Sequence, residues 1–192
     1  MVTFVKRLAM VVALVVAALT VPSSAQAVVP RDNGFYEIRS RANNLCLDVY
    51  GFSTADGGAV VQWPCNGAAN QQWRPLFVKF CSPFISITQM PCYVWMNKHS
   101  GKCLDVQWGN AASRTKIWQW RCDGNNAQLW MPRYRNADRA EYQLLSMLSD
   151  GQKKGFKCLD VPYVSRDPGV QQWIFDCNST VAQTYYLPVF KR

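Results

Sequence analysis

The chain has 192 residues, a formal net charge of +9 and 49% hydrophobic residues. This length allows one domain with a hydrophobic core. Lys and Arg are scattered, without the run of basic residues that marks a nucleic-acid-binding arm, so no nucleic-acid partner is expected. The positive charge favours solubility, and a basic surface would also suit acidic partners such as sulfated glycans or anionic cell-wall polymers.

The N-terminus has the order of a cleavable export signal. Lys6-Arg7 precedes an apolar run from Leu8 to Leu19, and small residues close the segment at Ala25-Gln26-Ala27. A membrane span needs about 20 apolar residues, so this run is too short to favour one. We therefore predict a signal peptide over residues 1–27 and a secreted mature domain over residues 28–192, with a retained N-terminal anchor as the alternative.

One tetrapeptide occurs three times in the predicted mature chain, and each copy begins with a cysteine. The copies are Cys46-Leu47-Asp48-Val49, Cys103-Leu104-Asp105-Val106 and Cys158-Leu159-Asp160-Val161. A second cysteine follows each copy at one fixed spacing, at Cys65, Cys122 and Cys177. A fixed internal repeat is stronger evidence for a fold than any local pattern.

All eight cysteines follow the predicted signal peptide, and an even number in an exported chain predicts a complete set of disulfides. The fixed spacing pairs the two cysteines of each repeat, which leaves one further pair by elimination. The predicted disulfides are Cys46–Cys65, Cys103–Cys122, Cys158–Cys177 and Cys81–Cys92.

Short strand-like segments flank these cysteines in the same order in each repeat. Those before the tetrapeptide are Phe35–Ile38, Tyr93–Met96 and Tyr142–Leu145. Those before the second cysteine are Val60–Trp63, Ile117–Trp120 and Val170–Trp173. A Gln-x-aromatic motif follows at Gln71–Trp73, Gln128–Trp130 and Gln183–Tyr185. Gly and Asn punctuate the joins, so the sequence predicts a closed all-β fold with little helix.

Two insertions lengthen the repeat period. The first spans roughly Leu76 to Pro91, and the predicted disulfide Cys81–Cys92 would clip it as a loop. The second spans roughly Asp150 to Lys157, is rich in Lys and Gly, and is predicted to be a surface loop.

These motifs cover almost all of the predicted mature chain and resemble those of the ricin B-type lectin domain, in which Cys-Leu-Asp-Val and Gln-x-Trp recur. The resemblance implies a β-trefoil of three pseudo-symmetric repeats, here about 34–77, 92–134 and 141–190, stapled by disulfides. It also implies a sugar pocket in each repeat. Such a pocket uses the aspartate of the tetrapeptide, an aromatic residue just before the second cysteine, and an Asn-Gln pair before the closing Trp.

The first repeat has the complete set, with Asp48, Trp63, Asn70 and Gln71. A carboxylate such as Asp48 accepts hydrogen bonds from two adjacent sugar hydroxyls, and charged acceptors make stronger bonds than neutral ones. A flat ring such as Trp63 covers the apolar C–H face of a sugar. Gln71 is expected to hold the aspartate in place, and the first pocket is predicted to be the best formed.

The other two repeats depart from the family's pattern at the asparagine. The second repeat keeps Asp105, Trp120 and Gln128, but Ala127 replaces the asparagine, and Asn126 stands one residue early. In the third repeat the residues at these positions are Asp160, Phe175, Ala182 and Gln183. We rank the three pockets in chain order as sugar sites.

Several residues are better explained by the core than by a ligand. The closing aromatic residues and the tetrapeptide leucines are predicted to be buried: Trp73, Trp130, Tyr185, Leu47, Leu104 and Leu159. Because Trp118 and Trp120 lie on one alternating strand, we expect one of them to face inward and the other outward. The three aspartates could alternatively cap turns.

The sequence argues against an enzyme and against a cofactor. His99 is the only histidine and lies in a predicted turn, so no His-based metal site is expected, and the cysteines are used in disulfides. A glycosidase needs two carboxylates in one pocket, roughly 5 to 10 Å apart, whereas the aspartates recur one per repeat.

We therefore predict a secreted carbohydrate-binding protein that uses up to three shallow pockets. Galactose-type sugars are what the resemblance implies first, with xylose, arabinose or mannose units as alternatives. Two other hypotheses remain open: the chain is the recognition subunit of a separate toxin or enzyme chain, or it is a trefoil used for protein recognition through the loop clipped by Cys81–Cys92.

Overall fold

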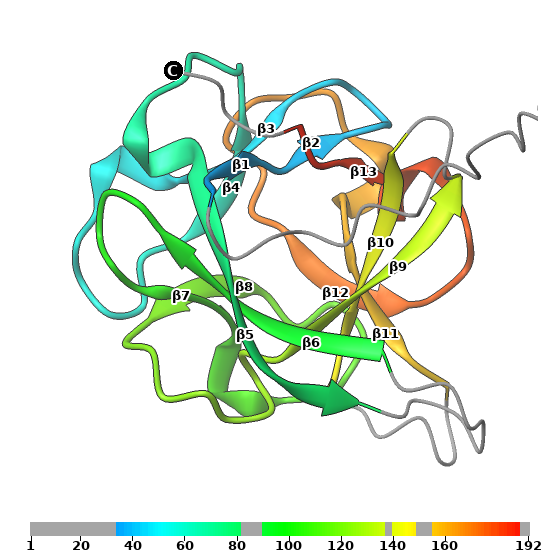
Figure 1. The fold of residues 1–192 in the computed structure, drawn as a ribbon. Coiled ribbons are helices and arrows are strands. Elements are labelled where there is room, and N and C mark those ends of the chain that lie inside the picture. The colour runs from blue at the N-terminus through cyan, green and yellow to red at the C-terminus, as the bar shows by residue number, and fades with distance from the viewer. Residues whose placement is uncertain (1–33, 82–89, 137–139, 149–154, 189–192) are drawn as a thin grey trace, which may run out of the picture.

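The computed structural model describes residues 34–81, 90–136, 140–148 and 155–188 (Figure 1). Within these ranges the regular elements are antiparallel β-strands and short 3₁₀ helices, which confirms the all-β class. The predicted signal peptide, residues 1–27, lies outside the described residues.

Seven strands form one ring of antiparallel pairs. They are β1 (Tyr36–Glu37), β2 (Arg39–Ser40), β5 (Gln72–Cys81), β6 (Met90–Asn97), β9 (Trp130–Asn136), β10 (Glu141–Ser146) and β13 (Tyr185–Tyr186). Along the sheet they follow the order β1-β5-β6-β9-β10-β13-β2. Only Ile38 separates β1 from β2, so the two ends of this path are one stretch of chain and the sheet closes into a barrel.

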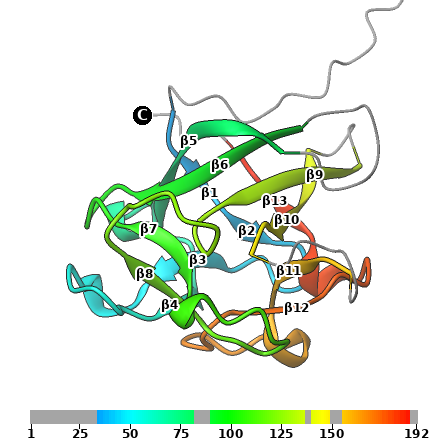
Figure 2. The same cartoon turned by 90° about the horizontal axis from the view of Figure 1, so that it is seen from below.

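Three hairpins complete the fold, one in each repeat. They are β3 (Cys46–Val49) with β4 (Val60–Trp63), β7 (Cys103–Val106) with β8 (Ile117–Trp120), and β11 (Lys157–Asp160) with β12 (Trp173–Asp176). Figure 2 shows the hairpins toward one side of the molecule and β5, β6 and β9 toward the opposite side. A six-segment barrel joined to three hairpins is the predicted β-trefoil, and the chain traces the same pattern three times.

A short 3₁₀ helix follows the first strand of each hairpin, and two more end on the glutamine that opens a Gln-x-aromatic motif. The first group is η1 (Tyr50–Phe52), η3 (Gln107–Gly109) and η4 (Pro162–Val164), and the second is η2 (Ala69–Gln71) and η5 (Val181–Gln183). The turns of the first group carry exposed aromatic side chains next to the hairpins.

The core is built from equivalent residues of the three repeats. The predicted core leucines and closing aromatic residues are all buried, at 2% exposed or less: Leu47, Leu104, Leu159, Trp73, Trp130 and Tyr185. Each of the two tryptophans also donates its indole N–H to a tetrapeptide carbonyl, from Trp73 to Leu47 and from Trp130 to Leu104, both at 3.0 Å. Buried indole groups need such a partner, so this contact fixes each ring against its own hairpin.

The four predicted disulfides are present. Cys46–Cys65, Cys103–Cys122 and Cys158–Cys177 each join residues 19 apart, and Cys81–Cys92 joins residues 11 apart. By the chain-entropy account, closing a loop of this size stabilises the folded state by about 3 kcal/mol. The three equivalent disulfides each tie the start of a hairpin to the segment that leaves it.

The first insertion differs from its prediction. Leu76–Pro91 was expected to be a loop, but β5 continues to Cys81 and pairs with β6 from Met90 onward, so the two strands extend beyond the barrel as a hairpin. The disulfide Cys81–Cys92 joins these two strands. In the second insertion, residues 150–154 lie outside the described residues, and Lys157 is not in a loop because it begins β11.

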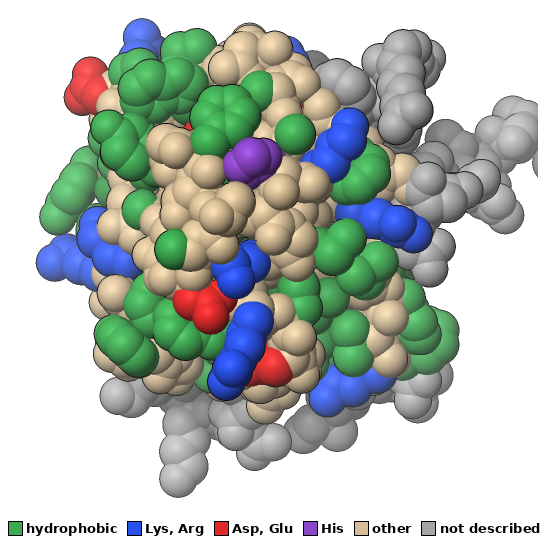
Figure 3. All heavy atoms as spheres, turned by 90° about the vertical axis from the view of Figure 1, so that its left-hand side faces the viewer, with side chains coloured by type: hydrophobic (Ala, Val, Ile, Leu, Met, Phe, Trp, Pro, Cys, Tyr) green, Lys and Arg blue, Asp and Glu red, His purple; other side chains and the backbone are tan. Residues whose placement is uncertain are grey.

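Basic side chains are spread over the surface. On the face shown in Figure 3, Lys and Arg lie among hydrophobic and polar side chains and do not gather into one patch. This arrangement agrees with the scattered positions of these residues along the sequence.

Candidate functional site

The first repeat brings its four predicted site residues onto one hairpin and the turn that follows it. Asp48 on β3 is buried, and its Oδ2 accepts hydrogen bonds from Asn70 Nδ2 at 2.9 Å and from Gln71 Nε2 at 2.8 Å. Its Oδ1 accepts no hydrogen bond from the described residues and is not fully buried, so it is available to a ligand hydroxyl. Trp63 on the paired strand is 37% exposed, and its ring lies edge-on to the exposed Tyr50 at 6.0 Å.

A glutamine holds the aspartate in the same way in every repeat. Gln71, Gln128 and Gln183 have no exposed surface, and each donates from Nε2 to an aspartate Oδ2, at 2.8, 2.9 and 2.9 Å respectively. Each also donates to a backbone carbonyl and accepts a backbone N–H. Because these amides are buried and their hydrogen bonds are satisfied, the three glutamines position the aspartates. Their predicted direct contact with a sugar stays a prediction.

The second repeat replaces the asparagine donor with a tryptophan. Ala127 stands at the position of Asn70 and cannot donate from its side chain. Instead, Trp118 donates its indole N–H to Asp105 Oδ1 at 2.6 Å. Trp118 faces Asp105 across the β7–β8 hairpin, at the register that Val61 occupies in the first repeat.

The third repeat makes the same exchange. Ala182 replaces the asparagine, and Trp173 donates its indole N–H to Asp160 Oδ1 at 2.6 Å. The register of the β11–β12 hairpin pairs Asp160 with Trp173. Both oxygens of Asp105 and of Asp160 therefore have a donor from the protein, whereas one oxygen of Asp48 has no donor among the residues that the structure describes.

Three tryptophans wall a pocket of about 410 Å³ in the second repeat. Trp118 stacks on Trp120 with ring centroids 4.8 Å apart, and Trp108 lies edge-on to Trp118 at 4.7 Å. The pocket is also lined by Asp105 and by the exposed Asn126. The expectation that Trp118 and Trp120 face opposite sides is wrong, because residues two apart on a strand point to the same face.

The third repeat forms a smaller pocket of about 240 Å³ with the same plan. Trp173 stacks on Phe175 at 6.0 Å, and Tyr163 lies edge-on to Trp173 at 5.0 Å. Asp160 contributes to the lining, and so does Arg114, which belongs to the second repeat. This pocket is therefore built by two repeats.

The aromatic residues at the pocket mouths occupy unfavourable backbone conformations. Trp108 has φ 58° and is 77% exposed, and Tyr163 has φ 55° and is 79% exposed. Gly51 has φ 62° at the equivalent place in the first repeat. Positive φ is rare for bulky residues and costs of order 1–3 kcal/mol, so it marks sites where the surrounding structure forces an exposed ring into place.

Burial raises the pKa of all three aspartates, Asp48, Asp105 and Asp160, above the ordinary value of 3.8. Their hydrogen-bond donors act in the opposite direction, since they stabilise the ionised form. In the second repeat the nearby negative charge of Asp123 adds to the increase. The pKa values are thus set by a balance between burial and the donors described above.

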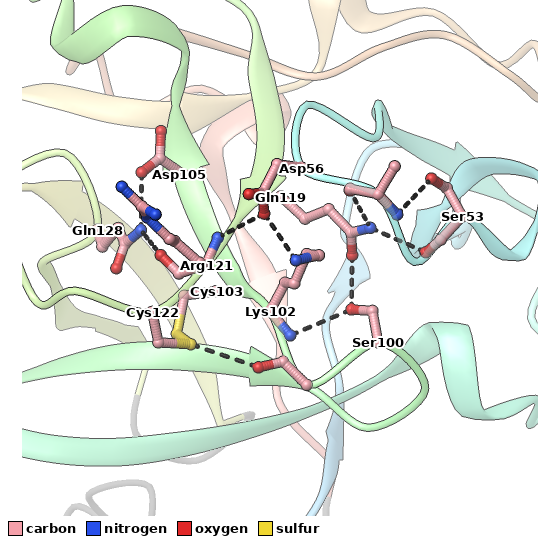
Figure 4. A network of polar contacts seen from close by, with 12 residues as sticks. Ser53, Asp56, Ser100, Lys102, Cys103, Asp105, Gln119, Arg121, Cys122 and Gln128 are labelled. Carbon is pink, nitrogen blue, oxygen red and sulfur yellow. Dashed lines mark hydrogen bonds and ion pairs between the residues drawn. A yellow bond between two sulfur atoms is a disulfide. The ribbon is translucent and has the colours of Figure 1, made fainter.

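Figure 4 shows how the second hairpin is tied to its surroundings. Gln128 lies between Asp105 and the backbone of Arg121, and Asp56 of the first repeat forms an ion pair with Lys102 at 2.6 Å. Asp56 also accepts the backbone N–H of Arg121 at 2.9 Å. The pocket aspartate therefore belongs to a network that continues into the neighbouring repeat.

One group of possible metal ligands occurs among the described residues, and its chemistry does not suit a metal. Glu37, Cys46 and Cys65 place their ligand atoms within 4.8 Å of one another. Cys46 and Cys65 form a disulfide, so neither sulfur is a thiolate.

Four aromatic residues of the pockets were not predicted from the sequence as site residues: Trp108, Trp118, Tyr163 and Trp173. A simple signal would have found two of them, because Trp118 and Trp173 stand at the same distance before the second cysteine of their repeats. The predicted segment Val170–Trp173 instead aligned Trp173 with Trp63 of the first repeat. In the structure Phe175, two residues later, holds the position equivalent to Trp63.

Comparison with protein families identifies the fold and its class. The model of the ricin-type β-trefoil lectin domain-like family matches residues 25–90 and 79–173. The chain therefore belongs to the ricin-type β-trefoil lectin family, whose fold is that of carbohydrate-binding lectin domains. No curated protein matches the chain. In the described part of the chain, no helix has the length and hydropathy of a membrane span.

Solved structures with the same fold include lectins and a part of an enzyme. The designed threefold-symmetric protein ThreeFoil has a TM-score of 0.67 and 26% identity, over 81% of this chain and 98% of that one. The C-half of the earthworm R-type lectin in complex with GalNAc has a TM-score of 0.57 and 17% identity, over 82% and 99%. An exo-β-1,3-galactanase from Clostridium thermocellum has a TM-score of 0.69 and 21% identity, over 84% of this chain but only 31% of the enzyme.

Proposed function

We propose that the protein is a secreted lectin that binds galactose-type sugars on glycans or polysaccharides, with the first repeat as its main site for neutral sugars. The observation that carries this proposal is the half-satisfied carboxylate of Asp48, which keeps Oδ1 available on the same β3–β4 hairpin that carries the exposed ring of Trp63. A sugar presents hydroxyls at its edge and C–H groups on its face, and this pair of side chains suits both.

The proposed export of the chain agrees with the same function. The proposed signal peptide, residues 1–27, would direct the domain over residues 28–192 to an oxidising compartment, where four disulfides form and persist. The proposed cleavage is tested by sequencing the N-terminus of the exported protein. A mature chain that still begins at Met1 would contradict it.

The second and third repeats are proposed to add weaker sites that rely on stacking. Their aspartates already have protein donors on both oxygens, and their aromatic walls are larger than that of the first repeat. Weak sites on one rigid domain gain avidity when the ligand is a polymer with repeated sugars. A polysaccharide is therefore expected to bind more tightly than its monosaccharide.

A matched pair of carboxylate-to-amide changes tests the main site. Asp48→Asn removes the negative charge. Because Asn70 and Gln71 donate to the oxygen that remains, the NH2 group takes the place of the free acceptor Oδ1, and binding of a galactose-type sugar is expected to weaken by at least about tenfold. Glu141→Gln makes the same chemical change on barrel strand β10, where the side chain pairs with Arg41, and should leave binding unchanged. Titration calorimetry measures both, after a glycan array has identified the sugar.

Trp63→Ala provides a second variant in case Asp48→Asn does not fold. Trp63 is partly exposed, so its loss should be tolerated, and loss of one stacking ring should weaken binding by about tenfold. Equal binding by the wild type, Asp48→Asn and Trp63→Ala would overturn the proposed site. Failure of the wild type to bind any sugar on the array would overturn the proposed function.

The likeness to part of a galactanase favours a second candidate, a recognition module that works with a separate catalytic chain. The chain spans 31% of that enzyme, which leaves the rest of the enzyme for other tasks. Under this proposal a glycosidase or toxin chain would co-purify with the protein from its own source. Purification without any partner chain would contradict it.

A further inference from the structure

The turn of each hairpin docks on the next repeat through one equivalent hydrogen bond. The backbone N–H of Gly57 donates to Gln119 at 2.9 Å, that of Arg114 to Ile174 at 2.7 Å, and that of Gly169 to Gln62 at 2.8 Å. The three donors occupy equivalent places in the three repeats. The residues at these three positions can therefore be compared directly, because each lies against the hairpin of the next repeat.

Two of these three positions are glycine, and the backbone explains why. The φ angles are +82° at Gly57, +76° at Arg114 and +82° at Gly169. Glycine adopts such angles without strain, whereas an arginine there is uncommon. An arginine held in a costly conformation at a pocket is a reason to look for a role for its side chain.

A side chain at this position meets the aromatic ring of the next repeat. A Cβ atom added to Gly57 would lie 3.5 Å from the ring of Trp118, and one added to Gly169 would lie 3.5 Å from the ring of Trp63. Arg114 follows this geometry, with Cζ 5.9 Å from the ring centroid of Trp173. Its side chain also lines the pocket of the third repeat.

A second basic residue, Lys116, also lies against Trp173, and the equivalent residues of the other two repeats are not basic. Lys116 pairs with Trp173 through an isolated β-bridge and holds Nζ 5.2 Å from its ring centroid. The equivalent bridges place Ala59 against Trp118 and Gln171 against Val61. Both basic residues therefore occur only where the second repeat meets the third.

Neither cation has an anionic partner in the described part of the chain. The ion pairs found there involve other residues, and no carboxylate lies within 4.0 Å of Arg114 or Lys116. Asp160 lies in the same pocket, but both of its oxygens accept hydrogen bonds from Trp173 and Gln183. The lining of the pocket thus combines a satisfied carboxylate with the guanidinium of Arg114, and the ammonium of Lys116 lies against the ring of Trp173, which also lines the pocket.

We propose that the third pocket binds a sugar that carries an anionic group, a carboxylate or a sulfate, with Arg114 and Lys116 as the residues that select it. A sugar ring stacks on the aromatic wall, and its anionic group meets the guanidinium and ammonium groups at the edge. Guanidinium groups bind carboxylates and sulfates through charge-assisted hydrogen bonds. This inference rests on the proposed function, because it names the ligand class of one of the proposed sugar sites.

The test replaces the two cations with the residues that the third repeat carries at the same places. The variant Arg114→Gly/Lys116→Gln copies Gly169 and Gln171 and should fold well, since glycine suits the positive φ at position 114. Titration calorimetry measures affinity for galactose, galacturonic acid and galactose 6-sulfate. The wild type should favour the two anionic sugars by at least about fivefold, and this preference should fall with salt because exposed charges are screened.

In the double variant the preference for anionic sugars should disappear. The affinity for galactose should change less than about twofold, because the two removed side chains interact with the anionic group, which galactose lacks. Arg114→Lys should keep most of the preference. The comparison of galacturonic acid with galactose 6-sulfate separates carboxylate from sulfate recognition. The protein should be made without N-glycosylation, because Asn178 of the sequon Asn178-Ser179-Thr180 lines this pocket.

The outcomes separate the inference from the function on which it rests. An unchanged preference for anionic sugars in the double variant would overturn the roles of Arg114 and Lys116, and so would equal binding of neutral and anionic sugars by the wild type. In both cases galactose binding would leave the proposed function intact. If the wild type binds none of the three sugars and no other glycan, the proposed function and the inference both fail.

Discussion

The first repeat and the second repeat satisfy the same buried aspartate in different ways. In the first, Asn70 and Gln71 both donate to one oxygen of Asp48 and leave the other without a donor from the described residues. In the second, Trp118 takes one oxygen of Asp105 and Gln128 takes the other. The third repeat follows the second.

One scaffold therefore supports two kinds of pocket. A buried carboxylate needs donors, and either an amide or an indole N–H provides one. The amide is small and leaves an open, polar site, whereas the indole brings a large ring that becomes part of the wall. A change at two positions, Asn to Ala and Val to Trp, therefore shifts a pocket from hydrogen bonding toward stacking.

The largest expected effect is a loss of stability when Trp118, which faces Asp105, is truncated. Val61, which faces Asp48 at the same register, provides the matched control. Trp118→Ala should lower the free energy of unfolding by about 4 kcal/mol, because it removes a buried ring and a donor to a buried carboxylate. Val61→Ala should lower it by about 2 kcal/mol, since it removes only two methyl groups. Urea unfolding measures both. Equal losses would show that the indole does not support Asp105.

A double-mutant cycle tests whether the amide and the indole are exchangeable. Ala127→Asn alone should destabilise the protein, because Ala127 is buried and Trp118 already occupies the donor's place. Adding Trp118→Val recreates the pair found in the first repeat and should recover about 1–2 kcal/mol relative to the sum of the single effects. Denaturant unfolding of the four proteins gives the coupling energy. Simple additivity would mean that the two donors are independent.

The aspartate pKa makes binding and stability respond to pH in opposite directions. Ligand hydroxyls need an ionised Asp48, and burial raises its pKa above 3.8, so binding should fall as pH is lowered through that raised pKa. The folded state then takes up the proton more readily than the unfolded state. The contribution of Asp48 to the free energy of unfolding should therefore rise as pH falls from the raised pKa toward 3.8.

Asn70→Ala sharpens this prediction. It removes one donor to the ionised form, worth about 1.5 kcal/mol, so the pKa of Asp48 should rise further and the midpoint of binding should move to higher pH. Calorimetric titrations at acidic to neutral pH measure the midpoint in both proteins. An unchanged midpoint would show that binding does not depend on this carboxylate.

The smallest effect is expected at the strained aromatic turn. Trp108→Gly copies Gly51 and removes the backbone strain, because glycine adopts a positive φ freely. It also removes a ring that packs on Trp118, so the two effects oppose each other and the free energy of unfolding should change by less than about 1 kcal/mol. Binding at the second pocket should still weaken by about fivefold through lost stacking. The reverse change, Gly51→Trp, should destabilise the first repeat. Unfolding and sugar titration together check these outcomes.

The fold was largely predictable because its determinants are local and repeated. The spacing of the cysteines in the three tetrapeptide repeats predicted their pairing, and the alternation of short apolar segments with Gly and Asn predicted strands and turns. The insertion near Cys81–Cys92 was mispredicted as a loop. Its strand pairing depends on β5 and β6 continuing beyond the barrel as partners, which no segment shows by itself.

The candidate site was predictable only in part. The aspartates were proposed as ligands because each stands inside the repeated tetrapeptide, and Trp63 and Asn70 because they stand where the resemblance to the ricin B-type lectin domain implies an aromatic residue and an asparagine. Trp118 and Trp173 were missed because the repeat suggested an asparagine donor and gave no sign that an indole could replace it. Arg114 was missed because its role depends on a contact with the following repeat.

The order of residues along the chain is enough to predict three disulfide-stapled copies of one β unit, since the spacing of cysteines and hydrophobic residues is a local property. Which pocket each residue lines depends on how the three repeats pack together. Hydrogen bonds to the aspartates and the docking of each turn on the next hairpin join residues that are far apart in sequence, so only closure of the barrel brings Arg114 and Lys116 to the third pocket.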